Sequence, residues 1–249
     1  MIEIRDLCKR FGSQVVLDGI TLTIEEGKTT AIVGPSGTGK SVLLKIITGL
    51  LTADSGEVVV NGRSMTGARS GAERREICSK MGVLFQGAAL FDSDTLLDNV
   101  AFPLRHRRTY RDREIVDRSL KCLQEVGLQG YELALPGEVS IGMRKRVGIA
   151  RALVTEPDII LFDEPNTGLD PQVGQEIYEL IAATQRGKGF TGIVVSHEIP
   201  EIFQVCDRVA MLYQGRVQVE GSVDDFLGST NPVVQQFVAG RVEGPIEFA

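Results

Sequence analysis

The residues best suited to chemistry form a glycine-rich stretch that contains one lysine and ends on a serine. A mostly apolar run at 30–33 precedes it, and apolar residues at helical spacing follow it over 43–50. In such a strand, loop and helix, main-chain N–H groups and the positive end of the helix dipole converge on a phosphate. Lysine supplies a mobile cation, and the serine hydroxyl suits Mg²⁺. We therefore predict a nucleotide phosphate site, rather than a loop that binds nothing, at Gly34, Pro35, Ser36, Gly37, Thr38, Gly39, Lys40 and Ser41.

Two adjacent carboxylates, Asp163 and Glu164, follow the continuous apolar run at 159–162. An aspartate at the end of a buried strand can hold Mg²⁺, and the next carboxylate can orient and deprotonate an attacking water. Taken alone, the pair is equally consistent with a helix cap. Together with the phosphate loop, it favours a catalytic metal and general-base site.

Three further side chains are candidates for the same site. His197 follows an apolar strand at 192–195, and we expect it to contact the γ-phosphate, although a lone histidine is more often structural. Gln86 ends a third strand, where its amide can reach the metal or the attacking water. Phe11 can stack on an adenine ring, and an ordinary role in a sheet explains it nearly as well. His106 lies in an arginine-rich segment predicted as a loop, and no role is assigned to it.

Ser140 and Gly142 stand at the start of a predicted helix. Ser140 is a good N-cap, and a helix start presents unpaired N–H groups. A capped helix is a sufficient explanation by itself. In the functional interpretation, these donors face the phosphate of a nucleotide bound to a second subunit.

The elements that must position these residues alternate between strand and helix. Strands before and after the phosphate loop predict an antiparallel sheet, and the later alternation predicts an α/β core with a mostly parallel sheet. Ligand groups are expected at the carboxyl ends of the parallel strands. We expect Asp112 to cap one helix and the end of the chain to be extended and outside the core. Helices are predicted over about 112–126, 140–153, 173–184 and 233–238.

Composition describes an ordinary globular protein. The chain has 249 residues, of which 43% are hydrophobic and 24% charged, and its net charge of −6 argues against nucleic acid as a partner. Apolar runs are too short for a membrane helix and no signal-peptide pattern begins the chain, so we expect a soluble protein. Widely spaced cysteines predict reduced, mostly buried thiols at Cys8, Cys78, Cys122 and Cys206.

The ordered set of motifs resembles the ATP-binding subunit of an ATP-binding cassette (ABC) transporter. The resemblance covers essentially the whole chain and implies a P-loop NTPase fold: a RecA-like core, an N-terminal antiparallel β-subdomain and an inserted helical subdomain. We expect one ABC ATPase domain over 1–249. Its predicted parts are the core at 1–86 and 156–230, the helical subdomain at 87–155 and the tail at 231–249.

The resemblance also implies roles for single residues and two cofactors, ATP and Mg²⁺. It implies a head-to-tail homodimer, in which each ATP lies between the phosphate loop of one subunit and Ser140 and Gly142 of the other. The implied roles are the adenine-side aromatic for Phe11, the metal- and permease-sensing amide for Gln86, the Mg²⁺ carboxylate for Asp163, the general base for Glu164, the dimer contact for Asp170 and the switch histidine for His197.

Narrower features are similar to Mla/Mce-type lipid transport ATPases (MlaF-like). They are the segments 85–91, 98–105 and 143–146 and the tail at 236–246. This resemblance implies phospholipid transport between bacterial membranes, with the subunit on the cytoplasmic face of the inner membrane. The implied partners are an MlaE-like permease, a periplasmic MCE-domain protein and a STAS-domain protein. The alternative cargo is a polar amino acid or another small solute.

Ile141 is a departure from the family pattern, which has glycine at this position of the signature Leu-Ser-Gly-Gly. A branched residue cannot adopt glycine-only backbone angles, and it places its side chain near the facing nucleotide. We therefore expect hydrolysis to be retained but slow. Two other classes compete with a transport ATPase. A soluble ABC protein of DNA repair or translation is disfavoured by the single cassette, and a subunit that hardly hydrolyses ATP is disfavoured by Glu164 and His197.

Overall fold

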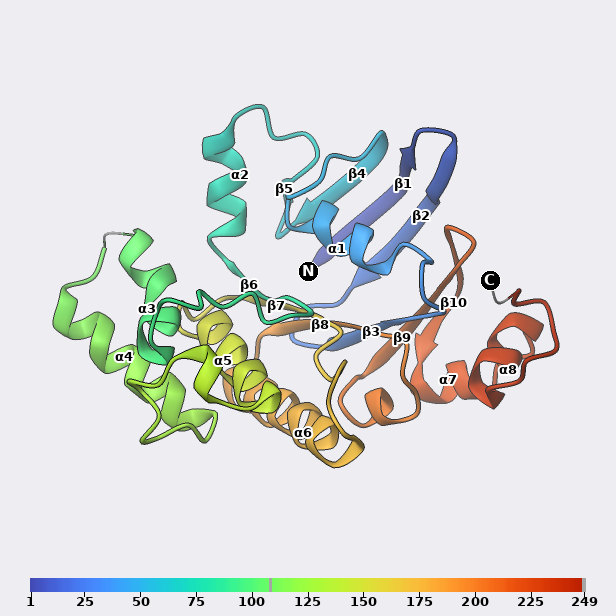
Figure 1. Ribbon diagram of the computed structural model, residues 1–249. Helices are drawn as coiled ribbons and strands as arrows, with labels where there is room; N and C mark the ends of the chain where they lie inside the picture. Colours follow the sequence, from blue (N-terminus) through green and yellow to red (C-terminus); the bar gives the residue numbers. More distant parts are fainter. Residues whose placement is uncertain (108, 248–249) are drawn as a thin grey trace. The chain divides into compact units, whose positions relative to one another are not determined.

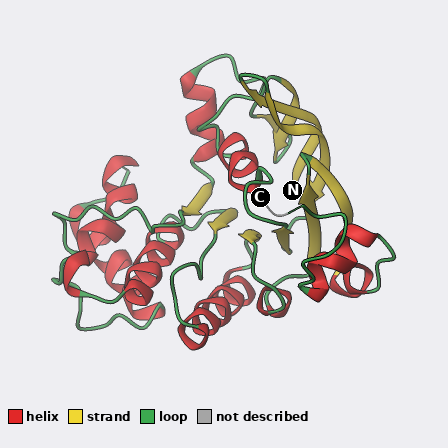
Figure 2. Ribbon diagram, turned by 45° about the vertical axis from the view of Figure 1, so that its right-hand side comes forward, coloured by secondary structure: helices red, strands yellow, loops and turns green. Residues whose placement is uncertain are grey.

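The computed structural model describes residues 1–107 and 109–247, and the chain divides into two compact units. The first unit consists of Met1–Ser79 and Thr191–Ala249, and the second of Lys80–Phe190. Figure 1 labels the elements of both units, and Figure 2 colours them by type. Within the described ranges, no helix is both long and apolar enough to cross a membrane.

An antiparallel sheet in the order β2-β1-β4-β5 opens the first unit, as the sequence predicts. Ile2 pairs with Ile24 and Ile4 with Leu22, and all four side chains are buried. Every second residue thus points into the core while its neighbours face outward. The strands are β1 (Ile2–Phe11), β2 (Gln14–Ile24), β4 (Ser55–Val60) and β5 (Arg63–Ser64).

The first unit also contains the parallel strands that carry the phosphate loop. Strand β3 (Thr29–Val33) lies between β8 (Thr191–Ser196) and β9 (Arg208–Tyr213), and both pairings are parallel. All five residues of β3 are buried, as expected for a strand covered on both faces. Strand β10 (Arg216–Ser222) pairs antiparallel with β9.

Helices complete the first unit. Helix α1 (Lys40–Ile47) follows the phosphate loop, and α7 (Val223–Leu227) and α8 (Pro232–Ala239) pack against β10. A short 3-10 helix spans Glu201–Gln204. Helix α2 (Gly71–Cys78) is absent from the prediction because Ile77 is its one buried residue, which leaves no apolar periodicity to detect.

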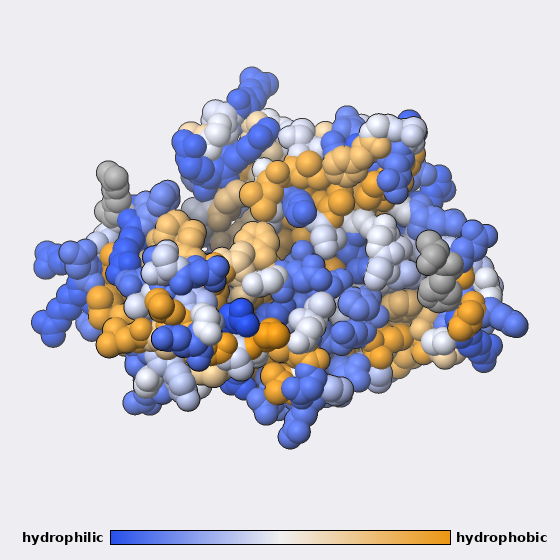
Figure 3. All heavy atoms as spheres, viewed as in Figure 1, coloured by the Kyte–Doolittle hydropathy of each residue, from blue (hydrophilic) through white to orange (hydrophobic). Residues whose placement is uncertain are grey.

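The second unit pairs two parallel strands, β6 (Met81–Leu84) and β7 (Ile159–Asp163), with a group of helices. Helices α3, α4 and α5 pack against one another (Figures 1 and 2), and α6 packs against α5. Apolar side chains are exposed among polar ones over these helices (Figure 3). The helices are α3 (Leu96–Arg107), α4 (Asp112–Glu125), α5 (Ile141–Leu153) and α6 (Pro171–Lys188), with a 3-10 helix at Pro136–Glu138.

Two expectations about the second unit are wrong. Asp112 does not cap α4, because the N-cap is Arg111 and no side chain accepts a hydrogen bond there. His106 lies in α3 and not in a loop. The sequence obscures this helix because Pro103 lies inside it, and prolines usually interrupt helices.

The expectation that the tail lies outside the core is also wrong. Ile246 is only 2% exposed, and its main-chain N–H donates to Gln236 Oε1 at 2.6 Å. The Gln236 amide donates in turn to the carbonyl oxygens of Arg241, Val242 and Ile246, each at 3.2 Å. The Gln236 side chain, together with the Tyr213 hydroxyl that bonds Pro245 and Glu247, therefore folds the segment 240–247 back onto the first unit.

All four cysteines are free thiols, but only Cys122 is fully buried, and the other three are partly exposed. Burial raises the pKa of the Cys122 thiol to about 11 and that of Cys206 to about 12. These two sulfurs are therefore protonated and unreactive near neutral pH.

Candidate functional site

The phosphate loop connects the end of β3 to the start of α1, and its backbone requires glycine. Gly34 has φ +146°, and a Cβ atom at this position would lie 2.1 Å from the main-chain oxygen of Leu212. Gly39, the N-cap of α1, has φ +96°, and a Cβ there would press on Val16 and Leu17. The loop can follow this path only because both residues lack a side chain.

Lys40 is 4% exposed, and its ammonium is folded over the loop. Its Nζ donates to the carbonyl oxygens of Gly34 and Pro35, each at 2.7 Å. At Gly37, in the exposed middle of the loop, a Cβ would meet no atom within 4 Å. A curled backbone, a local cation and open space beside the main chain fit a bound phosphate group.

His197 lies at the same edge of the sheet as the phosphate loop. In the parallel pairing of β3 with β8, Val33 is the partner of Ser196. Gly34 and His197 therefore follow paired residues, so both lie at the carboxyl ends of parallel strands. His197 is half-buried, and its Nε2 lies 4.0 Å from Glu198 Oε1.

Phe11 occupies the last position of β1 and is 49% exposed. The Lys9 ammonium lies 5.4 Å from the centroid of its ring, which is within the range of a cation–π contact. An exposed ring of this kind is available for stacking. Its adenine-binding role stays a prediction.

The second unit brings Gln86 and Glu164 together. Asp163 ends β7 and Glu164 follows it, while Gln86 lies two residues beyond β6. Because Leu84 pairs with Phe162 in the parallel sheet, the segments that follow β6 and β7 begin side by side. Gln86 Nε2 then donates to Glu164 Oε2 at 2.9 Å.

Thr167 also orients the Glu164 carboxylate, and sequence reasoning missed it. Its Oγ1 donates to Glu164 Oε2 at 2.9 Å, so one carboxylate oxygen accepts two hydrogen bonds. Glu164 itself has φ +48°, an uncommon conformation for a residue other than glycine. The available signal was a hydroxyl three residues after the carboxylate, which is also typical of an ordinary turn.

Each of the two units contains an oxygen donor of a kind that suits Mg²⁺. Within residues 1–107 and 109–247, no group of three or more His, Cys, Asp or Glu side chains could hold a metal by itself. Magnesium in nucleotide sites takes one or two protein oxygens and fills its other positions with phosphate and water. The Asp163 carboxylate of the second unit and the Ser41 hydroxyl of the first are donors of this kind, and their binding of one Mg²⁺ stays a prediction.

Ser140 is the N-cap of α5, and its Oγ accepts a hydrogen bond from the main-chain N–H of Met143 at 3.2 Å. Gly142 packs closely against α6, since a Cβ there would lie 2.7 Å from Cγ1 of Val173. Asp170 caps α6 by accepting from the Val173 N–H at 3.0 Å. Each of these three residues thus has a structural role. The nucleotide contacts of Ser140 and Gly142 and the dimer contact of Asp170 stay predictions.

The backbone expectation for Ile141 is wrong. Ile141 is the first residue of α5 and has the right-handed helical conformation that any residue adopts. Its side chain is 48% exposed at the helix start. The isoleucine therefore differs from glycine here in its side chain and not in its backbone.

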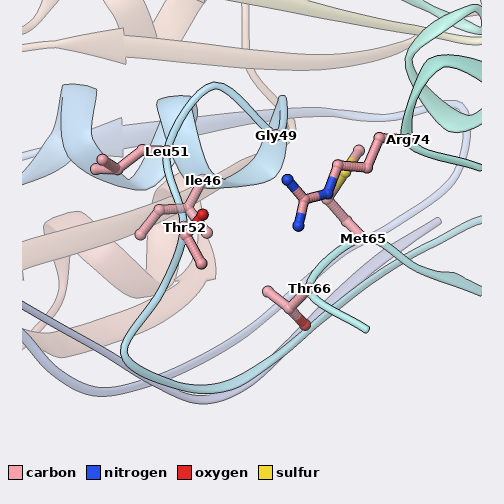
Figure 4. A pocket seen from close by; sticks show the side chains of 7 residues that line it. All are labelled: Ile46, Gly49, Leu51, Thr52, Met65, Thr66 and Arg74. Atoms are coloured by element: carbon pink, nitrogen blue, oxygen red, sulfur yellow. The ribbon is translucent and has the colours of Figure 1, made fainter. Parts of the chain in front are cut away.

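A small hollow in the first unit lies away from the phosphate loop, by the last turn of α1 (Figure 4). Its cavity volume is about 10 Å³, which is close to the space that one water needs. It is too small for a nucleotide. Its lining residues are Ile46, Gly49, Leu51, Thr52, Met65, Thr66 and Arg74.

Comparison with known proteins matches residues 17–167 to the ABC transporter family. The chain is 44% identical over 245 residues to the probable ribonucleotide transport ATP-binding protein mkl of Mycobacterium tuberculosis, a match that covers 98% of this chain and 68% of that protein. It is 36% identical over 248 residues to the intermembrane phospholipid transport system ATP-binding protein MlaF of Escherichia coli, covering 100% of this chain and 92% of the relative.

A solved dimer of the ATP-binding cassette MJ0796, in a post-hydrolysis state with ADP and Pi, is also similar. It has a TM-score of 0.81 and 32% identity, and the match covers 90% of this chain and 99% of that one. This likeness confirms the predicted P-loop ABC fold. With the family match over more than half of the residues, it follows that the chain belongs to the ABC transporter family as an ATP-binding ATPase subunit.

Proposed function

We propose that the subunit hydrolyses Mg²⁺-bound ATP, with Glu164 as the general base. The observation that carries the proposal is the orientation of one carboxylate by two donors, Gln86 and Thr167, at the end of β7. A carboxylate held in this way can accept a proton from an attacking water. Asp163 and Ser41 are assigned to Mg²⁺, and Lys40 to the outer phosphates.

We also propose that ATP closes a homodimer. The N-terminal end of α5 presents Ser140 and Gly142, and in the proposed dimer it faces the nucleotide on the phosphate loop of the second subunit. Support comes from the dimeric form of the similar MJ0796 cassette. A shift from 1:99 to 99:1 in favour of the closed state requires about 5.5 kcal/mol of differential binding. Phosphate contacts made only on closure are the proposed source, and hydrolysis removes them.

The proposed partner of the dimer is an integral membrane permease that docks near Gln86. Phe91 and Phe102, which follow Gln86 in the sequence, are 42% and 41% exposed, and their rings lie 4.8 Å apart. Such an exposed aromatic pair is suited to a protein interface. The subunit would thereby be a peripheral protein on the cytoplasmic face of the bacterial inner membrane.

Phospholipid is the proposed cargo. The likeness to MlaF, a phospholipid transport protein by name, extends over nearly the full length of both chains. On that basis we assign an MlaE-like permease, a periplasmic MCE-domain protein and a STAS-domain protein as partners. The second candidate is a small solute, favoured by the name of mkl, which is that of a ribonucleotide transport protein.

Substitution of Glu164 by Gln tests the ATPase proposal, because it keeps the size of the side chain and removes the base. We expect ATP turnover to fall by about 10²–10⁴-fold while ATP binding persists. With ATP and Mg²⁺ bound, the variant should sediment as a dimer. The matched control is Glu179→Gln, an exposed carboxylate on α6, which should hydrolyse ATP normally. Unchanged turnover in Glu164→Gln would refute the assignment.

Reconstitution tests the cargo. The subunit and the permease that co-purifies with it are placed in vesicles with labelled phospholipid, or with labelled ribonucleotide or amino acid. ATP-dependent movement of phospholipid, abolished by Glu164→Gln, is the expected result. Movement of the small solute alone would favour the second candidate.

A further inference from the structure

Lys145 is a buried cation that the proposed mechanism does not use. It lies in α5, is 2% exposed, and belongs to the second unit together with Gln86 and Glu164. Its ammonium donates to the main-chain carbonyl oxygen of Gln86 and, at 3.1 Å, to that of Glu164. A single side chain therefore holds the main chains of the two residues whose side chains bond to each other.

Close packing of α5 on β6 places the ammonium there. A Cβ on Gly82 of β6 would lie 2.5 Å from the Ala152 carbonyl oxygen of α5. A Cβ on Gly148 of α5 would lie 2.5 Å from Cδ1 of Leu84. Two glycines, one on each element, thus bring the helix close enough for Lys145 to reach the ends of both β6 and β7.

The contacts close a ring of hydrogen bonds. Lys145 joins the backbones of Gln86 and Glu164, and the Gln86 amide joins the Glu164 carboxylate at 2.9 Å. Glu164 needs such support, since its φ of +48° is uncommon for a residue with a side chain. Loss of the ammonium would leave two part-buried main-chain carbonyl groups without this donor and free the Glu164 backbone to relax.

The charge of Lys145 also faces the catalytic carboxylates. Burial lowers the pKa of the Lys145 ammonium, and the carboxylates of Glu164 and Asp163 act in the opposite direction. A lysine can donate three hydrogen bonds and accept none, so it suits a site made of carbonyl and carboxylate oxygens. Arg146 has other partners, since its guanidinium donates to the main-chain oxygen of Val126 and to the Glu176 carboxylate.

We propose that Lys145 is a positioning residue for ATP hydrolysis: it maintains the Gln86–Glu164 pair in the arrangement that activates water. The inference rests on the proposed role of Glu164. It assigns a second role to helix α5, which Ser140 caps: the helix holds the general base of its own subunit. Lys145 acts through Glu164 and touches no reacting atom.

The first experiment measures ATP hydrolysis by the full chain carrying Lys145→Met. We expect kcat to fall at least about tenfold, with KM for ATP within about threefold, because misplacing a reacting group slows chemistry more than binding. Arg146→Met is the matched control, since it removes a cation from the same helix turn, and its kcat should stay within about threefold of the original. Equal kcat in the two variants would overturn the proposal.

A double-mutant cycle with Gln86→Ala separates positioning from general support of α5. If Lys145 acts through the Gln86–Glu164 pair, Lys145→Met and Gln86→Ala together should reduce kcat no more than the larger single effect. In the double variant Arg146→Met with Gln86→Ala, the two reductions in kcat should instead multiply. Multiplicative losses in the Lys145 cycle would reduce Lys145 to a structural residue.

A second variant covers the case in which Lys145→Met does not fold. Lys145→Gln keeps a hydrogen-bond donor, and its kcat should lie between those of the original chain and a Gln86→Ala variant. A kcat equal to the original would contradict the proposal. Failure of this inference is distinguishable from failure of the proposed function, because Glu164→Gln still abolishes turnover in the first case and leaves it intact in the second.

Discussion

The phosphate loop and the Glu164 cluster hold their functional groups by different means. In the loop, main-chain geometry does the positioning: Gly34 and Gly39 have positive φ, and Lys40 folds onto loop carbonyls. In the cluster, side chains do it, since Gln86 and Thr167 bond the Glu164 carboxylate and Lys145 bonds its backbone. A site built from the backbone should therefore lose ligand binding when one glycine gains a methyl group. A site built from side chains should lose part of its activity with each side chain that is removed.

The largest effect is expected from Gly34→Ala. Its Cβ would lie 2.1 Å from the Leu212 carbonyl oxygen, so the loop must shift. We expect ATP binding to be lost and the free energy of unfolding to fall by about 1–3 kcal/mol, as measured by calorimetry and by denaturation in urea. Gly12→Ala is the control, because Gly12 has φ +59° but open space around it. Equal ATP affinity in the two variants would contradict a backbone-built site.

The next effect is expected from Thr167→Val. The substitution keeps the shape of the side chain and removes one of the two donors to Glu164 Oε2. The loss of one hydrogen bond to a charged group, about 1.5 kcal/mol, corresponds to roughly a tenfold lower kcat. Steady-state kinetics should show an unchanged KM for ATP. Thr184→Val, whose hydroxyl donates to Leu180 on α6, should leave both constants unaltered.

Gln236→Ala should affect folding and not catalysis, since it removes hydrogen bonds that lie within the C-terminal tail. Four hydrogen bonds of this residue hold Arg241, Val242 and Ile246, and none involves the phosphate loop. We expect the free energy of unfolding to fall by about 1–3 kcal/mol, with kcat unchanged at a temperature where the chain is folded. The exposed neighbour Gln235 provides the control. A lower kcat in Gln236→Ala would show that the tail also affects the site.

The smallest effect is expected from Ile141→Gly. Ile141 is already helical and half-exposed, so glycine relieves no strain there. Its higher backbone entropy should lower the free energy of unfolding by at most about 1 kcal/mol. ATPase activity of the full chain should change by less than about threefold. A large gain in activity would show that the isoleucine side chain, and not the backbone, hinders the partner's nucleotide.

Some elements were predictable because their signals are local. The phosphate loop combines glycine spacing with strand and helix flanks, and each of the buried strands β3, β7 and β8 contains a short run of apolar residues. Helix α5 was expected from its Ser140 cap. Helices α2 and α3 were not, since one buries a single residue and the other contains Pro103. Apolar periodicity in a sequence reflects burial, so it does not reveal a helix that buries few residues or one that contains a proline.

By itself, the sequence determined which backbone segments can bind phosphate and which strands end in carboxylate, amide or imidazole groups. Only the tertiary structure decided which of those groups meet. Gln86 reaches Glu164 because β6 and β7 pair in a particular register, and Lys145 reaches both because two glycines let α5 approach. The physical reason is range: backbone conformation and burial leave local patterns in a chain, whereas hydrogen bonds between residues 59 and 78 positions apart depend on packing.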